Sequence, residues 1–187
     1  MTPTPSSRGV DADGPAAVAV SRRAVVALGS NLGERLAALQ GALDRLADTP
    51  GVRLVAASPV YESAPVGGPV GAGDYLNAVV VIDTTLRPTQ LLEQLHAIES
   101  CFGRVRRSRN DPRTLDLDLV VLGSHLQRSA ELTLPHPRAG ERPFVLRPWL
   151  DVDPSAELPG SGSVADLLAR GDTDGLRRRT DLSLELR

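Results

Sequence analysis

The spacing of apolar residues between positions 23 and 122 is the feature that most restricts the fold. Apolar runs typical of strands lie at 23–28, 52–61, 75–85 and 112–122. Large apolar residues recur every three or four positions in two further segments, 32–46 and 88–102, as on one face of an amphipathic helix. Ser30 and Asn31 stand where caps of the first helix are expected. The order of elements is therefore β-α-β-β-α-β.

This order predicts an α+β fold with a ferredoxin-like core. In that plan an antiparallel sheet carries both helices on one face and leaves the other face available to a ligand. Short strands and helices are expected after the core, including a helix near 144–150 and one that begins at Ser163. We expect residues 1–21 to be a disordered tail, 22–180 to form a single domain, and 181–187 to be a C-terminal tail.

Composition narrows the possible chemistry. All 21 basic residues are arginine, which excludes a Schiff-base lysine and the lysine of a Walker A loop. The formal net charge of −2 and the aromatic content of 3% argue against a nucleic-acid-binding sheet. No apolar run is long enough to span a membrane, and a single cysteine fits a reduced, cytoplasmic setting.

Two aspartates interrupt the apolar segment PRTLDLDLVVL at 112–122. Because side chains alternate along a strand, Asp116 and Asp118 face the same side, roughly 6–7 Å apart at Cα. Leu115, Leu117, Leu119 and Val121 are expected on the opposite side. Two carboxylates this close raise each other's pKa unless a cation lies between them. The pattern indicates either a divalent-cation site or ion pairs with nearby arginines.

The segment RVRRSRNDPR at 104–113 places five arginines directly before these aspartates. Guanidinium groups suit phosphate oxygens, and a cation pair beside arginines is typical of polyphosphate sites. The alternative is a solvated basic loop. Tyr75 and Asn77 share one strand face and could contact a planar heterocycle, or be ordinary strand residues. His136, between two prolines, could donate to phosphate or fix a turn.

Taken together, these segments resemble the 6-hydroxymethyl-7,8-dihydropterin pyrophosphokinase family of folate biosynthesis. The matching stretches are VVALGSNLGER, SPVYESAPVG, DYLNAVVVIDTTL, IESCFGRVRR, PRTLDLDLVVLG, LTLPHPR and RPFVLRP, over about residues 23–155. The most specific of them is PRTLDLDL followed by LPHP. The resemblance implies that diphosphate passes from ATP to the pterin hydroxymethyl group and that AMP is released.

The resemblance also implies roles for individual residues. It implies that Asp116 and Asp118 bind two magnesium ions, and that Arg106 and Arg109 act with them in catalysis. The pterin contacts would be Ser63, Ala64, Val66, Tyr75, Asn77 and Phe144. The ATP contacts would be His96, Glu99, Arg106, Arg109, Arg113, Thr133, His136 and Arg142. Asn31 falls in the first loop of the family.

The chain departs from the family pattern at Asn110, Asp111, Glu131 and Pro137. These departures affect the expected lid and adenine contacts more than the metal and pterin positions. The expected partners are ATP and the pterin, with no nucleic acid and no membrane, and the chain is expected to act as a monomer. A nucleic-acid module and an inactive pterin-binding regulator are the alternative functions.

Overall fold

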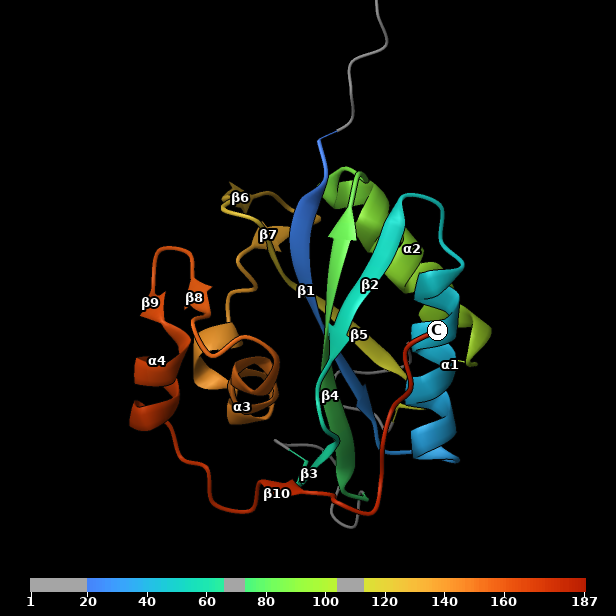
Figure 1. Ribbon diagram of the computed structural model, residues 1–187, viewed down its shortest axis with the longest axis vertical. Coiled ribbons are helices and arrows are strands. Elements are labelled where there is room, and N and C mark those ends of the chain that lie inside the picture. The colour runs from blue at the N-terminus through green and yellow to red at the C-terminus, as the bar shows by residue number, and fades with distance from the viewer. Residues whose placement is uncertain (1–19, 66–72, 104–112) are drawn as a thin grey trace, which may run out of the picture.

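The protein is described by a computed structural model in which residues 20–65, 73–103 and 113–187 are placed. A central antiparallel sheet contains the strands β1 (Arg22–Ser30), β4 (Tyr75–Thr84) and β5 (Asp116–Leu122). β1 lies in the middle, with β4 on one side and β5 on the other (Figure 1). The outer edge of β4 is shared by two short strands: β2 (Val52–Ala57) pairs with one half of β4 and β3 (Tyr61–Ser63) with the other.

The helices α1 (Arg35–Ala47) and α2 (Pro88–Cys101) cover one face of the sheet, as the sequence predicts. Their leucines pack against alternate residues of β1, among them Val26 and Leu28, to form the larger of two apolar cores. The α+β fold class is therefore confirmed, and the predicted order of elements holds except that two short strands, β2 and β3, stand where one strand was expected. None of the helices within the placed residues is long and apolar enough to cross a membrane.

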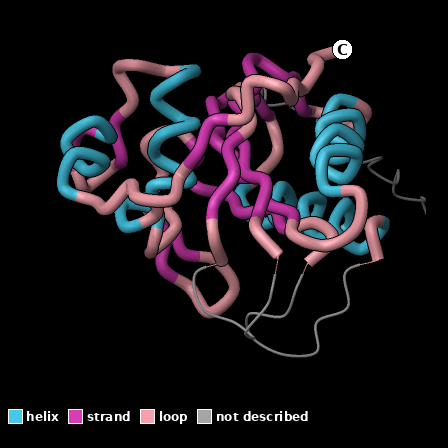
Figure 2. Tube along the Cα trace, turned by 90° about the horizontal axis from the view of Figure 1, so that it is seen from below, coloured by secondary structure: helices cyan, strands magenta, loops and turns pink. Residues whose placement is uncertain are grey.

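The opposite face is free over only part of its area. Residues after β5 form the short strands β6 (Gln127–Arg128) and β7 (Thr133–Leu134), the 3₁₀ helix η1 (Ala139–Glu141) and the helix α3 (Pro143–Val152). They are followed by β8 (Glu157–Leu158), β9 (Gly162–Ser163) and the helix α4 (Val164–Arg170). α3 and α4 pack over this face, so the sheet lies between two helical layers (Figure 2). Ser163 caps α4 through its side chain, as expected.

A β-bulge in β5 changes which side chains face the helices. Val25 of β1 pairs with Val121, and the next residue, Val26, pairs with Leu119, so Val120 is an extra residue. The regular alternation predicted for β5 consequently holds from Asp116 to Leu119 and fails beyond it. Val121, expected beside the leucines, instead packs with Val120 in the second core, under α3.

The chain after α4 returns to the sheet and continues to α1. The strand β10 (Arg177–Arg178) pairs with β3 and so forms the outermost strand of the sheet. Leu182 and Leu184 then pack against the larger core, and the C-terminus lies beside α1 (Figure 1). Gln40 of α1 exchanges two hydrogen bonds with the backbone of Glu185. Residues 181–187, for which the sequence predicted no element, thus run along α1.

Candidate active site

Two adjoining hollows share one wall; the first lies on the partly open face of the sheet and the second at the β5 edge. The first hollow is lined by residues from the ends of β1, β3, β4 and α3, among them Ser63, Tyr75, Asn77 and Phe144. The second lies between α2, β5 and the segment around β7. Asp116, Asp118 and Arg113 line both hollows. The two aspartates therefore stand at the boundary between two binding spaces.

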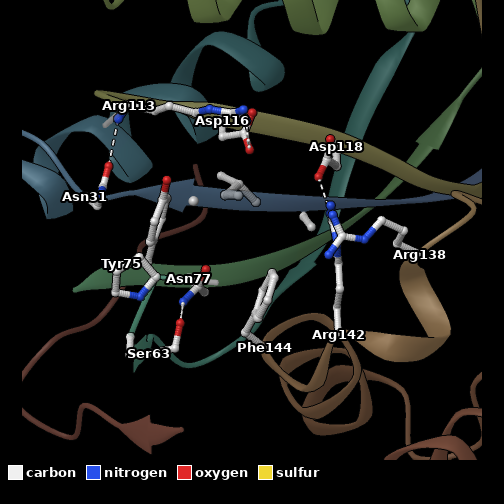
Figure 3. Close-up of a pocket in the computed structure, with 15 residues that line it drawn as sticks. Asn31, Ser63, Tyr75, Asn77, Arg113, Asp116, Asp118, Arg138, Arg142 and Phe144 are labelled. Atoms are coloured by element: carbon white, nitrogen blue, oxygen red, sulfur yellow. Dashed lines mark hydrogen bonds and ion pairs between the residues drawn. The ribbon is translucent and has the colours of Figure 1, made fainter. Parts of the chain in front are cut away.

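The first hollow has the shape and polarity that a flat heterocycle needs. Tyr75 and Asn77 project from β4 on one face because they are two residues apart. The ring of Tyr75 points toward Asp116, and the amide nitrogen of Asn77 points toward Ser63 (Figure 3). Tyr75 and Phe144 stand on either side of Asn77 in this view. A β-carbon at Gly29 would lie 3.6 Å from both Tyr75 and Asn77, so this glycine keeps the floor between them open.

Hydrogen bonds fix the polar groups of this hollow. The Asn77 amide donates to Ser63 Oγ over 3.0 Å, because β3 pairs with β4 in the register that places Ser63 opposite Tyr75. Phe144 lies at the start of α3, and the Arg142 guanidinium is 5.8 Å from the centroid of its ring, a cation–π distance. Ala64 also lines this hollow. Val66 falls outside the residues that the structure describes.

The two aspartates are compensated by arginines on either side. Arg113 Nη1 contacts Asp116 Oδ2 at 2.6 Å, and Arg142 Nη1 contacts Asp118 Oδ2 at 2.7 Å. The ion pairs that the sequence left as an alternative are therefore present. They leave 21% of the Asp116 side chain and 32% of the Asp118 side chain exposed. The two carboxylates thus have arginine partners and also keep exposed surface on which a cation can bind.

The donor set suits Mg²⁺. Magnesium prefers hard oxygen ligands and is usually held by one or two carboxylates, with substrate phosphates and water completing its octahedron. Asp116 and Asp118 provide two such ligands on one strand face. Among the residues that the structure describes, no group of three or more acidic, histidine or cysteine side chains could hold a metal by itself. A cation at this site needs further ligands from a substrate.

The second hollow brings together His96, Glu99, Thr133 and His136, all predicted as ATP contacts. Glu131 and Pro137, two of the departures from the family pattern, line it as well.

Arg142 was also predicted as an ATP contact. It lines the first hollow and reaches the boundary through Asp118. Arg106, Arg109, Asn110 and Asp111 fall outside the described residues.

Glu99 has a structural contact within this hollow. Glu99 is only 2% exposed, and its Oε1 accepts a hydrogen bond of 2.8 Å from the backbone N–H of Leu117. Leu117 lies between the two aspartates on β5, whose outer edge pairs with no other strand of the sheet within the described residues. Glu99 therefore ties α2 to the strand that carries both carboxylates.

His136 is held in one tautomer by the backbone. The backbone N–H of His136 donates to Val120 O at 2.8 Å, which fixes the residue beside the bulge of β5. Its ring Nδ1 accepts from the Arg138 N–H at 3.1 Å, so the neutral ring carries its proton on Nε2. Burial lowers the pKa of His136, and the nearby Asp118 carboxylate opposes this shift. The ring can therefore donate one hydrogen bond through Nε2 while uncharged.

Asn31 and Arg138 were not among the predicted site residues, yet both line the first hollow. Asn31 does not cap α1, which begins four residues later at Arg35. Its Oδ1 instead accepts from the Arg113 N–H at 2.7 Å, and its Nδ2 donates to Gly73 O at 3.3 Å. The position of Asn31 at a strand end was a usable signal, but a polar residue before a helix is more often read as a cap.

Comparisons with known proteins agree with this geometry. Residues 25–154 match the family described as 7,8-dihydro-6-hydroxymethylpterin-pyrophosphokinase (HPPK). The 2-amino-4-hydroxy-6-hydroxymethyldihydropteridine pyrophosphokinase of Pseudomonas aeruginosa is 43% identical over 157 residues, which cover 84% of this chain and 96% of that protein. The protein of the same name from Mycobacterium tuberculosis is 43% identical over 171 residues, covering 83% and 88%.

Solved structures support the fold. A Plasmodium falciparum HPPK-DHPS triple mutant, crystallised with STZ-DHP, matches with a TM-score of 0.64 at 12% identity. The match covers 81% of this chain and 43% of that one, so this chain spans less than half of the Plasmodium chain. From the family match and the sequence identities together, the chain belongs to the 7,8-dihydro-6-hydroxymethylpterin-pyrophosphokinase family.

Proposed function

We infer that this chain is an ATP-dependent pyrophosphokinase of folate biosynthesis, which transfers diphosphate from ATP to 6-hydroxymethyl-7,8-dihydropterin and releases AMP. The single observation that carries the site assignment is the shared wall. Asp116 and Asp118 border both hollows, so a flat substrate in one and a nucleotide in the other meet at the same carboxylates. A transfer between two bound substrates requires this arrangement.

On the pterin side, the rings of Tyr75 and Phe144 would pack on the heterocycle, and the amide of Asn77 would bond its polar edge. Ser63 and Ala64 line the same hollow, and Val66 follows them in the sequence. The Asn77–Ser63 hydrogen bond pre-orients the amide before the substrate arrives. These contacts would direct the hydroxymethyl group toward the aspartates.

On the nucleotide side, Arg113 and His136 would donate to phosphate oxygens, His136 through its Nε2 proton. His96, Glu99 and Thr133 line the remainder of this hollow. We propose that Arg106 and Arg109 add positive charge at the group in transfer, as the arginine-rich sequence before the aspartates indicates. Arg142 would contribute through its contact with Asp118.

In the reaction the hydroxymethyl oxygen attacks the β-phosphorus of ATP in line. The bond from that phosphorus to the α–β bridging oxygen breaks, AMP leaves, and the hydroxyl proton passes to water. Mg²⁺, of which we propose two ions on Asp116 and Asp118, would neutralise charge on the phosphates and lower the pKa of the attacking hydroxyl. The protein contributes positioning and fixed charge, and no side chain is required to act as a general base.

Formation of AMP tests this function directly. Incubation of the protein with ATP, Mg²⁺ and 6-hydroxymethyl-7,8-dihydropterin should yield AMP and pterin diphosphate in equal amounts, and omission of any one component should abolish both. An absence of AMP from the complete mixture would refute the proposal, and so would AMP formed without the pterin. Sedimentation of the same sample tests the further prediction that the chain is a monomer.

A further inference from the structure

The C-terminal segment, residues 177–187, crosses the edge of the sheet beside the first hollow, and we call it the C-terminal strap. The first hollow is called the pterin hollow below, and the second the nucleotide hollow. Its first two residues form β10, which pairs with the three-residue strand β3. The next N–H, that of Arg179, donates to Val60 O at 2.8 Å. At its far end the strap is fastened to α1 by two hydrogen bonds between Gln40 and Glu185. The strap therefore braces the outer side of β3.

Glu62, the central residue of β3, gathers three arginines on the α1 side of the sheet. Its register opposite Leu76 turns its side chain away from the pterin hollow, and the side chain is only 9% exposed. The carboxylate contacts Arg177 and Arg179 of the strap and Arg35 of α1, the last two at 3.1 Å. The hydrogen bond from Arg177 holds the pKa of Glu62 below its ordinary value. One buried carboxylate thus joins the strap to the start of α1.

The same contacts reach the residues proposed to bind pterin. Ser63 directly follows Glu62, and its hydroxyl accepts the hydrogen bond that orients Asn77. Arg35 Nη1 contacts Glu62 and also donates to Asp74 O at 2.6 Å, immediately before Tyr75. Glu62 and Arg35 therefore fix the end of β3 and the start of β4, which are the two strand ends that form one wall of the hollow.

We propose that the C-terminal strap is a positioning element of the pterin site, although none of its residues is among the described residues that line the first hollow. Arg177 and Arg179 act through Glu62 to hold β3 in register with β4, and this register sets the place of Ser63 and the orientation of Asn77. This role rests on the function proposed above. Strap residues should consequently control pterin affinity while leaving the nucleotide hollow, on the far side of β1, unaffected.

The decisive experiment compares variants of the full chain with the unchanged chain. Arg177→Ala combined with Arg179→Ala removes two of the three cations from Glu62. Arg178→Ala is the matched control, because Arg178 is exposed on the same strand and pairs opposite Tyr61 rather than Glu62. Binding of 6-hydroxymethylpterin is measured by fluorescence. Steady-state AMP formation gives kcat and the KM for each substrate.

The double variant should raise the pterin Kd and KM at least tenfold, with the KM for ATP within twofold of the unchanged chain. The control should match the unchanged chain, and replacing both arginines by lysine should restore most of the pterin affinity. Glu62→Gln, which keeps the size of the side chain, should repeat the double variant's effect and guards against a variant that fails to fold. Hydrogen exchange of the backbone amides of residues 60–63 should be faster in the double alanine variant and in Glu62→Gln.

Equal pterin constants in the unchanged chain and the folded double variant would overturn the positioning role. A parallel loss of ATP and pterin affinity would do the same, because it would indicate general destabilisation. If the unchanged chain bound no pterin and formed no AMP, the proposed function and the role of the strap would both fail. These outcomes are distinguishable in one set of measurements.

Discussion

Replacement of Glu99 by alanine separates two roles that this residue could have, a nucleotide contact and a support for β5. The substitution removes the acceptor of the 2.8 Å hydrogen bond from Leu117 N–H at a site where water has little access. A buried donor left without a partner costs about 1–3 kcal/mol, and the acceptor here is a carboxylate, at the upper end of that range. We therefore expect a loss of about 3 kcal/mol.

For a chain of this length, 1 kcal/mol corresponds to a shift in Tm of about 2–4 °C, so Glu99→Ala should lower Tm by about 6–12 °C in calorimetry. Glu99→Gln retains an acceptor oxygen and should lose less than half as much. Assayed at 20 °C, the alanine variant should also need more Mg²⁺ for half-maximal AMP formation, because Leu117 lies between Asp116 and Asp118. A wild-type Tm for Glu99→Ala would refute the reasoning, as would an equal loss of ATP affinity in both variants with unchanged stability.

Four further outcomes follow from the site and the strap. Asp118→Asn should lower Mg²⁺-dependent AMP formation at least about 100-fold while pterin binding stays within threefold; near-normal turnover would exclude a metal role. Phe144→Ala should weaken pterin binding by about 1–3 kcal/mol by fluorescence titration, and unchanged affinity would mean that the ring serves only the core. His136→Gln, which can place an N–H near the position of Nε2, should raise the KM for ATP less than His136→Asn; the reverse order would contradict the assigned tautomer. Because the folded pKa of Glu62 is lowered, its ion pairs stabilise the strap above about pH 4, the ordinary glutamate value. That stability should be lost as pH falls further, through the lowered pKa, so hydrogen exchange of 177–187 should rise only in that acid range, and a rise near pH 6 would refute the assignment.

The sequence predicted the core of the fold because its periodicities are strong and local. Steps of three and four residues define α1 and α2, a continuous apolar run defines β4, and alternation defines the first half of β5. The bulge at Val120 could not be predicted, because it depends on how β5 pairs with β1. The strand expected at 52–61 is in fact two strands, since Ser58 and Pro59 interrupt it and Ser58 Oγ accepts the Val79 N–H instead.

The site was harder to predict where residues from distant segments combine. Asp116 and Asp118 could be placed on one face from strand geometry alone. The three arginines around Glu62 could not, because they are brought to it from α1 and from the C-terminal strap, far from Glu62 in the chain. Asn31 was read as a helix cap, since its partners Gly73 and Arg113 are 42 and 82 residues away in the chain. Tertiary contacts of this kind leave no periodic trace.

The single extra residue in β5 has a consequence for how this strand can vary. Before Val120, alternation keeps the carboxylates of Asp116 and Asp118 facing the substrates. After Val120, the strand keeps Leu122 in the core under α1 and α2. Substitutions at Val120 leave these two halves facing the same sides as before. Deletion of Val120 would leave a regularly alternating strand in which Asp116 and Asp118 keep their face and Leu122 stays in the core. Regular alternation of all seven residues of β5 would instead turn Leu122 to the face of the aspartates, so the strand can lose its extra residue but cannot pair it in the ladder.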